Sequence, residues 1–151
     1  PLTPANINEV VGESVMYFRK RIPRNVTLDY NGLAIAPVRA SINTALFEWV
    51  VENLMKNSLD ALQGHGAIDV HISSDDKHVM VDVKDTGKGI PKGNWKRIFE
   101  PGFTTKTRGW GLGLSLSRRI VEEYHDGRIA VVDSEIGKGT TIRITLKRLF
   151  D

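Results

Sequence analysis

Three short polar segments follow one another along the chain, each inside or next to a stretch with helical or strand periodicity. The first is the run ENLMKNSLDAL, in which Asn53 and Asn57 are one helical turn apart. The second is DTGKGI, residues 85–90, and the third is GWGLGL, residues 109–114. Together they predict a pocket with amide oxygens on one wall, a carboxylate at one end and backbone N–H groups at the other. Such a pocket suits a nucleotide and a divalent metal ion.

Length and composition predict a single domain over residues 1–151 with an ordinary hydrophobic core. Hydrophobic residues make up 40% of the chain and charged residues 26%. The absence of cysteine excludes disulfides and thiolate metal sites. A net charge of +3 is too small to indicate nucleic acid as a partner, and no apolar run approaches the roughly 18–20 residues of a membrane span. Because the chain begins at Pro1 without methionine, we expect it to be part of a longer protein.

Helical and strand patterns alternate along the chain. Three helices are predicted, over residues 7–18, 44–62 and 112–124, with Asn43 as the cap of the second. Five strands are predicted, over residues 26–30, 67–73, 78–85, 128–132 and 140–146. The long glycine-rich segment 87–111 contains one short helical patch around residues 95–99. This order predicts an α/β fold, a two-layer sandwich with a largely antiparallel sheet covered on one face by helices.

Asn53 and Asn57 place two amide groups close together on the same side of the second predicted helix. Asparagine is a poor residue for a helix interior, so its presence at both positions is informative. An amide oxygen is a suitable hard ligand for Mg²⁺. The alternative is an ordinary solvated helix face that also includes Asp60.

Asp85 shares the inward face of its strand with Val81 and Val83, because alternate residues point to the same side. A carboxylate there needs a donor, and the amino group of a base would supply one. Thr140 occupies the corresponding inward position at the start of the last strand. Gly87 and Gly89 remove Cβ atoms, which would let the backbone approach a ligand. The alternative is a simple turn after the strand.

Gly109, Gly111 and Gly113 precede or begin the third helix, where free N–H groups and the helix dipole can bind phosphate. Residues just upstream could contact a terminal phosphate: Thr104, Thr105, Lys106 and Arg108. The alternative is a flexible basic loop. Neither the P-loop nor the Rossmann glycine pattern is present. The histidines lack metal-ligand spacing, and we expect all four at the surface or at helix ends: His65, His71, His78 and His125.

These motifs resemble, over nearly the whole chain, the ATP-binding catalytic domain of bacterial sensor histidine kinases. That domain is part of the GHKL superfamily with DNA gyrase, MutL and the large heat-shock ATPase chaperones. ENLMKNSLDAL resembles the N box and DTGKGI the first glycine box, while IFEPGFTTK, residues 98–106, resembles the phenylalanine box. GWGLGL resembles the second glycine box, and residues 134–141 the final S-x-x-G-x-G-T-T element.

The resemblance implies a Bergerat-type fold and a site for ATP and Mg²⁺. Asn57 would hold the Mg²⁺ and Asn53 would support it, while Lys106 would lie near the terminal phosphate. Asp85 would accept the adenine amino group, with Thr140 helping through water, and residues 87–111 would form a mobile lid. The implied nucleotide-binding residues are Asn53, Asn57, Asp60, Asp85, Gly87, Gly89, Ile90, Thr104, Thr105, Lys106, Gly109, Gly111, Leu112, Gly113, Leu114 and Thr140.

Three positions depart from the family patterns. Asn53 replaces the water-activating glutamate of gyrase-type ATPases, which counts against hydrolysis as the main activity. Asp60 stands where many histidine kinases have a basic residue, and Trp110 is bulky for the second glycine box. Two rival functions stay open: an ATP-gated switch of the gyrase or MutL class, and a nucleotide-binding scaffold without transfer activity.

The resemblance also implies partners. No histidine in the chain precedes glutamate, as the family's phosphoacceptor does, so the γ-phosphoryl group would pass to a histidine on a separate dimerisation hairpin. A response regulator would act downstream. We expect this fragment to be a monomer and the parent kinase a homodimer. We expect a bacterial, cytoplasmic location without membrane contact by the fragment, in a parent that a membrane segment could anchor.

Overall fold

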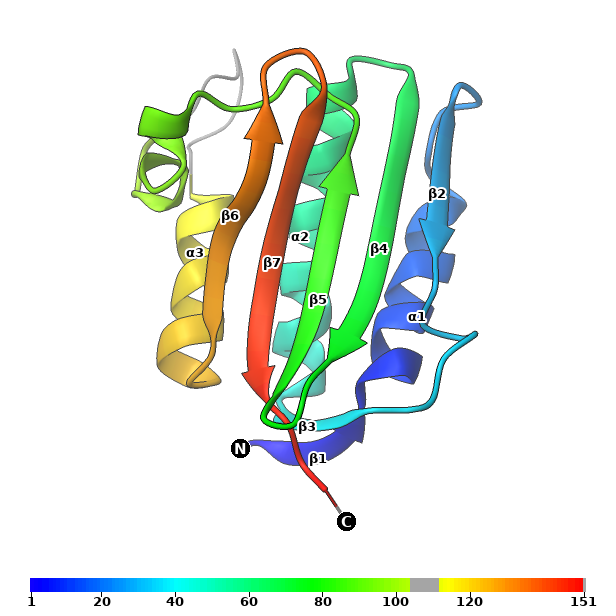
Figure 1. Cartoon of the computed structure of the whole chain (residues 1–151), viewed down its shortest axis with the longest axis vertical. Coiled ribbons are helices and arrows are strands. Elements are labelled where there is room, and N and C mark those ends of the chain that lie inside the picture. Colours follow the sequence, from blue (N-terminus) through cyan, green and yellow to red (C-terminus); the bar gives the residue numbers. More distant parts are fainter. Residues whose placement is uncertain (104–111, 151) are drawn as a thin grey trace.

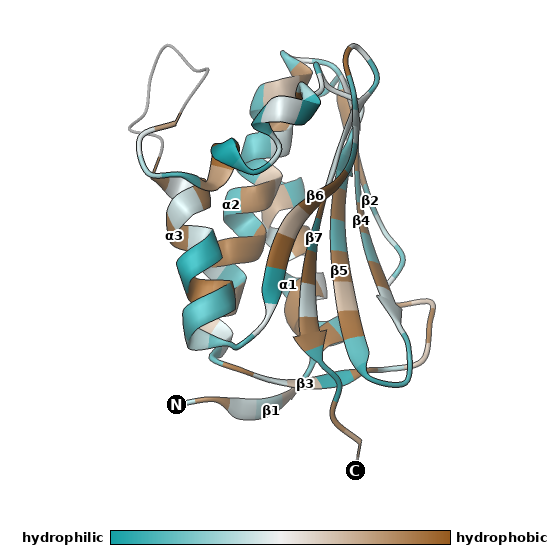
Figure 2. Ribbon diagram, turned by 60° about the vertical axis from the view of Figure 1, so that its left-hand side comes forward, coloured by the Kyte–Doolittle hydropathy of each residue, from teal (hydrophilic) through white to brown (hydrophobic). Residues whose placement is uncertain are grey.

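The computed structural model describes residues 1–103 and 112–150, which form two layers (Figure 1). One layer is a five-stranded sheet, and the other consists of helices packed against one face of it (Figure 2). The helices are α1 (Ile7–Arg19), α2 (Thr44–Leu62) and α3 (Gly113–Arg119). The α/β sandwich predicted from the alternating patterns is confirmed.

The five strands lie in the order β2-β4-β5-β7-β6. Their bounds are β2 (Val26–Tyr30), β4 (Gly66–Ser74), β5 (His78–Asp85), β6 (Arg128–Glu135) and β7 (Gly139–Lys147). β2 and β4 pair in parallel, and the other neighbours are antiparallel, as a largely antiparallel sheet requires. A separate two-stranded sheet joins β1 (Thr3–Asn6) to β3 (Arg39–Ile42). We did not predict these two strands, since each is only four residues long and lacks a distinctive pattern.

The core lies between the sheet and the helices, where the apolar faces of the two layers meet (Figure 2). α2 is the central helix, and one side of it is fully buried through Phe47, Val50, Val51, Leu54 and Met55. Its cap is the one predicted, because the side chain of Asn43 accepts a hydrogen bond from Leu46 N at 3.0 Å. The helix ends at Leu62, and the next residue, Gln63, adopts a left-handed conformation.

The third helix differs from the prediction. Instead of one α-helix over 112–124, α3 continues into a π-helical turn, η3 (Ile120–Tyr124). The backbone N–H of His125 bonds to the carbonyl of Ile120, five residues earlier, which is the π-helical spacing. The pattern of apolar residues does not separate an α-turn from a wider one, so this change could not be predicted.

Sequence reasoning expected every histidine at the surface or at a helix end, and the structure confirms this expectation. His125 does follow a helix, but its ring is buried. Its Nδ1 lies 2.9 Å from Ile120 O, and its Nε2 accepts a hydrogen bond from the backbone N–H of Asn43 at 3.1 Å. The ring therefore joins the end of one helix to the beginning of another, a contact between residues far apart in the sequence.

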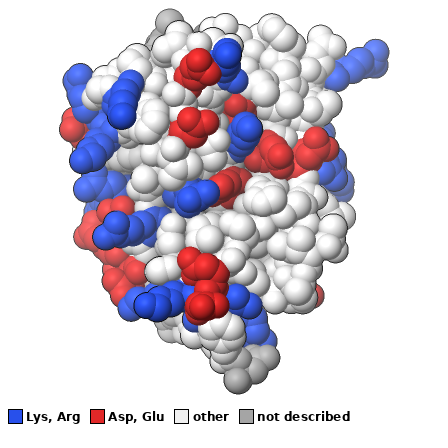
Figure 3. Space-filling view, viewed as in Figure 1, with Lys and Arg blue, Asp and Glu red and all other residues white. Residues whose placement is uncertain are grey.

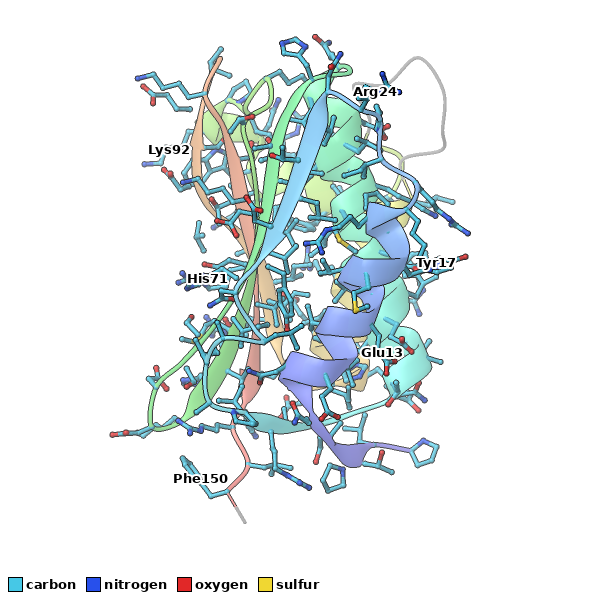
Figure 4. The ribbon with its side chains drawn as sticks, turned by 90° about the vertical axis from the view of Figure 1, so that its right-hand side faces the viewer. Glu13, Tyr17, Arg24, His71, Lys92 and Phe150 are labelled. Atoms are coloured by element: carbon cyan, nitrogen blue, oxygen red, sulfur yellow. The ribbon has the colours of Figure 1, made fainter. Side chains whose placement is uncertain are left out.

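The outer face of the sheet carries polar and charged side chains of both signs (Figure 3). Arg143 and Asp82 form a two-pronged ion pair across β7 and β5, with Nε–Oδ1 at 2.8 Å and Nη2–Oδ2 at 2.9 Å. Figure 4 places His71 on this face, whereas Glu13 and Tyr17 point outward from α1 on the opposite side of the molecule. None of the helices in residues 1–103 and 112–150 has the length and apolar character that crossing a membrane requires.

Candidate functional site

The end of β5, the beginning of β7 and the last turns of α2 lie at the same end of the molecule, beside the loop that follows β5 (Figure 1). β5 ends at Asp85, and the antiparallel register places Thr140 of β7 directly opposite. The two inward-facing polar residues that strand parity predicted are thus neighbours, and both are buried.

The carboxylate of Asp85 is held by donors from three parts of the chain. The backbone N–H of Gly87 donates to Oδ1 at 2.8 Å. Burial raises the pKa of this carboxyl group above its ordinary value, while hydrogen bonds from Gly87, the Ser58 hydroxyl and the backbone of Thr140 oppose that rise. A carboxylate has about four acceptor positions. The three protein donors leave capacity for a further donor, which is the property that recognition of an amino group requires.

A small hydroxyl network connects Thr140 to the segment after β5. The Oγ1 of Thr140 lies 2.8 Å from Ser134 Oγ, which in turn accepts a hydrogen bond from the backbone N–H of Ile90 at 2.8 Å. Ser134 also donates to Gly139 O at 3.1 Å. The network connects the beginning of β7, the end of β6 and Ile90, the last residue of DTGKGI.

Gly87 and Gly89 lie where the chain packs closely against itself. A Cβ atom at Gly87 would lie 2.6 Å from Ala61 O, and one at Gly89 would lie 2.3 Å from Glu135 O. Gly89 also has a φ of +80°. The close approach is therefore between parts of this chain, since the nearest atoms belong to α2 and to the β6–β7 turn. That these glycines also let the backbone approach a ligand stays a prediction.

Asn53 and Asn57 project from α2 and are half-buried. The Nδ2 of Asn57 donates to the carbonyl of Asn53 at 3.0 Å, so the amide nitrogen faces its own helix. The Nδ2 of Asn53 donates to Ser117 Oγ on α3 at 3.0 Å. In both side chains the nitrogen is engaged within the protein, and the oxygen is the atom with the chemistry of a Mg²⁺ ligand.

All three polar segments meet along α2. Gly113, from the third segment, lies against Asn53: a Cβ there would be 2.7 Å from Asn53 Oδ1. Ser58, next to Asn57, bonds to Asp85 of the second segment. One turn further on, Ala61 O accepts the backbone N–H of Lys88 at 3.2 Å. The sequence predicted that these segments share a site, and the structure brings them together on one helix.

The remaining predicted residues divide into two groups. Asp60 is exposed on α2, Leu112 is exposed just before α3, and Leu114 packs partly buried against the core. The other predicted residues lie outside the described part of the chain: Thr104, Thr105, Lys106, Gly109 and Gly111. Within residues 1–103 and 112–150, no group of three or more His, Asp or Glu side chains is arranged to hold a metal ion.

Sequence reasoning gave no individual role to three serines, although Ser134 begins the S-x-x-G-x-G-T-T element. Ser58 hydrogen-bonds Asp85, Ser117 contacts Asn53, and Ser134 contacts both Thr140 and Ile90. Serine is common on surfaces, so its presence alone carries little information. For Ser58 a signal did exist, because it immediately follows Asn57 inside the first segment.

The fold and this arrangement define a two-layer α/β domain with a polar site at one end of its central helix. Residues 43–149 match the family described as histidine kinase-, DNA gyrase B-, and HSP90-like ATPase. The match covers more than half of the chain, and the chain therefore belongs to this family.

The relatives are bacterial sensor kinases. The chain is 32% identical over 164 aligned positions to the sensor kinase CckA of Brucella abortus (strain 2308), covering 97% of this chain and 17% of that protein. It is 46% identical over 95 residues to sporulation kinase E of Bacillus subtilis (strain 168), covering 62% of this chain and 13% of that protein. The chain thus spans less than a fifth of the length of either relative.

Solved structures confirm the fold over the whole domain. The catalytic domain of the histidine kinase ThkA superposes with a TM-score of 0.82 at 28% identity, covering 98% of this chain and 96% of that one. A mycobacterial sensor histidine kinase, MprB, matches in fold with a TM-score of 0.84 at 24% identity, covering 98% of each chain. The predicted resemblance to histidine-kinase catalytic domains is confirmed.

Proposed function

We propose that this chain binds ATP with Mg²⁺ and, within a longer protein, presents the γ-phosphoryl group to a histidine on a dimerisation hairpin. The observation that supports this most directly is the meeting of three segments on α2, with the carboxylate of Asp85 at one end and two amide side chains at the other. By the resemblance to this family, the arrangement would be the nucleotide site.

The side chains of this site fit both the nucleotide and the metal ion. Asp85 has acceptor capacity for the adenine amino group, and Thr140 lies directly opposite it. Asn57 would hold the Mg²⁺ through its amide oxygen, with Asn53 beside it one turn earlier. The ion would neutralise charge on the phosphates, while the protein orients the nucleotide and provides electrostatic stabilisation.

The partners in this proposal are the phosphoacceptor hairpin and a response regulator. A solved complex of the histidine kinase ThkA with the response regulator protein TrrA contains a domain that matches this chain with a TM-score of 0.81 at 26% identity. The match covers 98% of this chain and 42% of that kinase. Because ATP is an intracellular metabolite, the proposal places this domain in the cytoplasm.

The first experiment is a calorimetric titration with ATP, with and without Mg²⁺, using GTP as the control nucleotide. We expect saturable binding that Mg²⁺ strengthens and that favours ATP over GTP. Absence of binding at millimolar nucleotide would overturn the proposal.

A second experiment separates transfer from hydrolysis. The chain is incubated with radiolabelled ATP and a histidine-bearing hairpin from a related kinase, and both phosphohistidine and free phosphate are measured. We expect label on the hairpin and little release of phosphate. Rapid release of phosphate without label on the hairpin would favour the ATP-gated switch instead.

A further inference from the structure

Ser117 lies on α3, one turn after Gly113, and its side chain is completely buried. Its hydroxyl donates to Gly113 O at 2.8 Å and accepts a hydrogen bond from Asn53 Nδ2 at 3.0 Å. The serine therefore connects the amide of Asn53, on the central helix, to the first turn of α3.

The number of protons determines which way the amide of Asn53 is turned. A serine hydroxyl has a single proton, and that of Ser117 is used in the bond to Gly113 O. Only a donor can then approach the lone pairs of Ser117, so the nitrogen of Asn53 faces it. If the amide were rotated by a half turn, the Ser117 hydroxyl would have to give up its bond to Gly113 O in order to donate to the amide oxygen.

The amide oxygen of Asn53 consequently lies on the side of Gly113. A Cβ atom at that glycine would be 2.7 Å from Oδ1 and 3.2 Å from Nδ2. A methyl group at position 113 would therefore displace this amide from its observed position. This contact accounts for the glycine at position 113 independently of any binding of phosphate.

We infer that Ser117 is a positioning residue: it holds the amide of Asn53 so that the oxygen, and not the NH₂ group, faces the metal and nucleotide. The inference rests on the proposed function. Without Ser117 the amide can turn over, and an NH₂ group near Mg²⁺ is unfavourable because it brings positive partial charge towards a cation.

The test is calorimetric titration of ATP, with and without Mg²⁺, on Ser117→Ala and on the matched control Ser115→Ala. Ser115 is on the same helix and also buried, but its hydroxyl bonds to Leu112 O at 3.0 Å and to no residue of α2 in the described contacts. We expect Ser117→Ala to reduce the strengthening by Mg²⁺ about fivefold while affinity without Mg²⁺ is unchanged. Ser115→Ala should resemble the wild type.

A double-mutant cycle distinguishes positioning from general packing. In an Asn53→Ala background, Ser117→Ala should have no further effect on the Mg²⁺ dependence, because the group that it orients is gone. Ser117→Cys serves as a second variant, since it fills the buried space while offering a much weaker hydrogen-bond acceptor. We expect it to behave like Ser117→Ala, with thermal unfolding checked for every variant.

Four outcomes would overturn the inference. Equal losses with and without Mg²⁺ would mean a purely structural role, and additivity with Asn53→Ala would mean an effect independent of that amide. If Mg²⁺ strengthens ATP binding equally in the wild type and in both Ser117 variants, the inference about Ser117 is wrong while the proposed function stands. A wild-type chain that binds no ATP would remove the proposed function and this inference with it.

Discussion

The two ends of the site are built differently. At the Asp85 end, the carboxylate is buried and receives hydrogen bonds from Gly87, Ser58 and Thr140, while Ser134 ties the neighbouring loop to the sheet. At the Asn57 end, the amides are half-buried, and Leu112 before α3 is exposed. The first end consists of buried groups attached to the sheet, whereas the second lies where α2 meets α3.

From this difference we expect one end to recognise the base and the other to bind the phosphates and the metal ion. A base is recognised by matching a few donors and acceptors, which favours rigid groups whose positions do not change on binding. Phosphates and a metal ion are charged and hydrated, and they have to be admitted and released. We therefore expect substitutions at the Asp85 end to change which nucleotide binds, and substitutions at the Asn57 end to change how strongly Mg²⁺ contributes.

The largest effect is expected for Asp85→Asn. An amide of the same shape loses the charge and presents an NH₂ group towards the donors Gly87 and Ser58. We expect ATP affinity to fall about 30-fold, with most of the preference for ATP over GTP lost. Titration with both nucleotides measures this change. Asp82→Asn is the matched control, since Asp82 is on the same strand but pairs with Arg143 on the outer face; an equal loss in that variant would contradict the assignment.

Asn57→Ala should act at the other end. Removing the amide oxygen deletes the proposed ligand, so the strengthening of ATP binding by Mg²⁺ should fall about tenfold, while the preference for ATP over GTP remains. The measurement is the ratio of dissociation constants with and without Mg²⁺. An unchanged ratio would exclude Asn57 as the metal ligand. Lys56→Ala, an exposed neighbour on α2, provides the control.

Ser58→Ala sharpens the comparison with a smaller change. It removes one of the three donors to Asp85 without altering the charge, so ATP affinity should fall about fivefold and Mg²⁺ dependence should stay as it is. Loss of the same donor should raise the pKa of Asp85 further. A change in the Mg²⁺ ratio, as in Asn57→Ala, would show that the two ends are not separable.

The smallest effect is expected from pH. Burial raises the pKa of Asp85 above its ordinary value of 3.8, so the folded chain takes up this proton at a higher pH than the unfolded chain does. The ionised carboxyl therefore destabilises the fold at high pH, and this cost disappears as pH falls through the raised pKa. ATP binding needs the ionised form, so affinity should fall in the same interval, by about twofold at the pKa itself, where half of the groups are protonated.

Titration of ATP against pH, in wild type and in Asp85→Asn, measures that effect. The variant has no carboxyl group at this position, so the difference between the two profiles isolates Asp85 from the protonation of the nucleotide. Parallel profiles would show that Asp85 does not titrate in this range or does not contact the base.

The sequence by itself determined the local elements and the identity of the site's main groups. The strand over 26–30 and the cap at Asn43 were predicted as they occur, and strand parity placed Asp85 and Thr140 on the inward face. These features depend on interactions between residues a few positions apart. The three segments together predicted one shared pocket, and the family resemblance implied ATP and Mg²⁺ as its ligands.

Only the tertiary structure decided how those parts meet. The pairing of β5 with β7 sets Asp85 opposite Thr140, and the packing of α3 on α2 sets Ser117 against Asn53. The same holds for the parallel pairing of β2 with β4 and for the burial of His125. Register and helix packing are contacts between residues distant in the chain, and side chains as common as serine acquire a role only through such contacts.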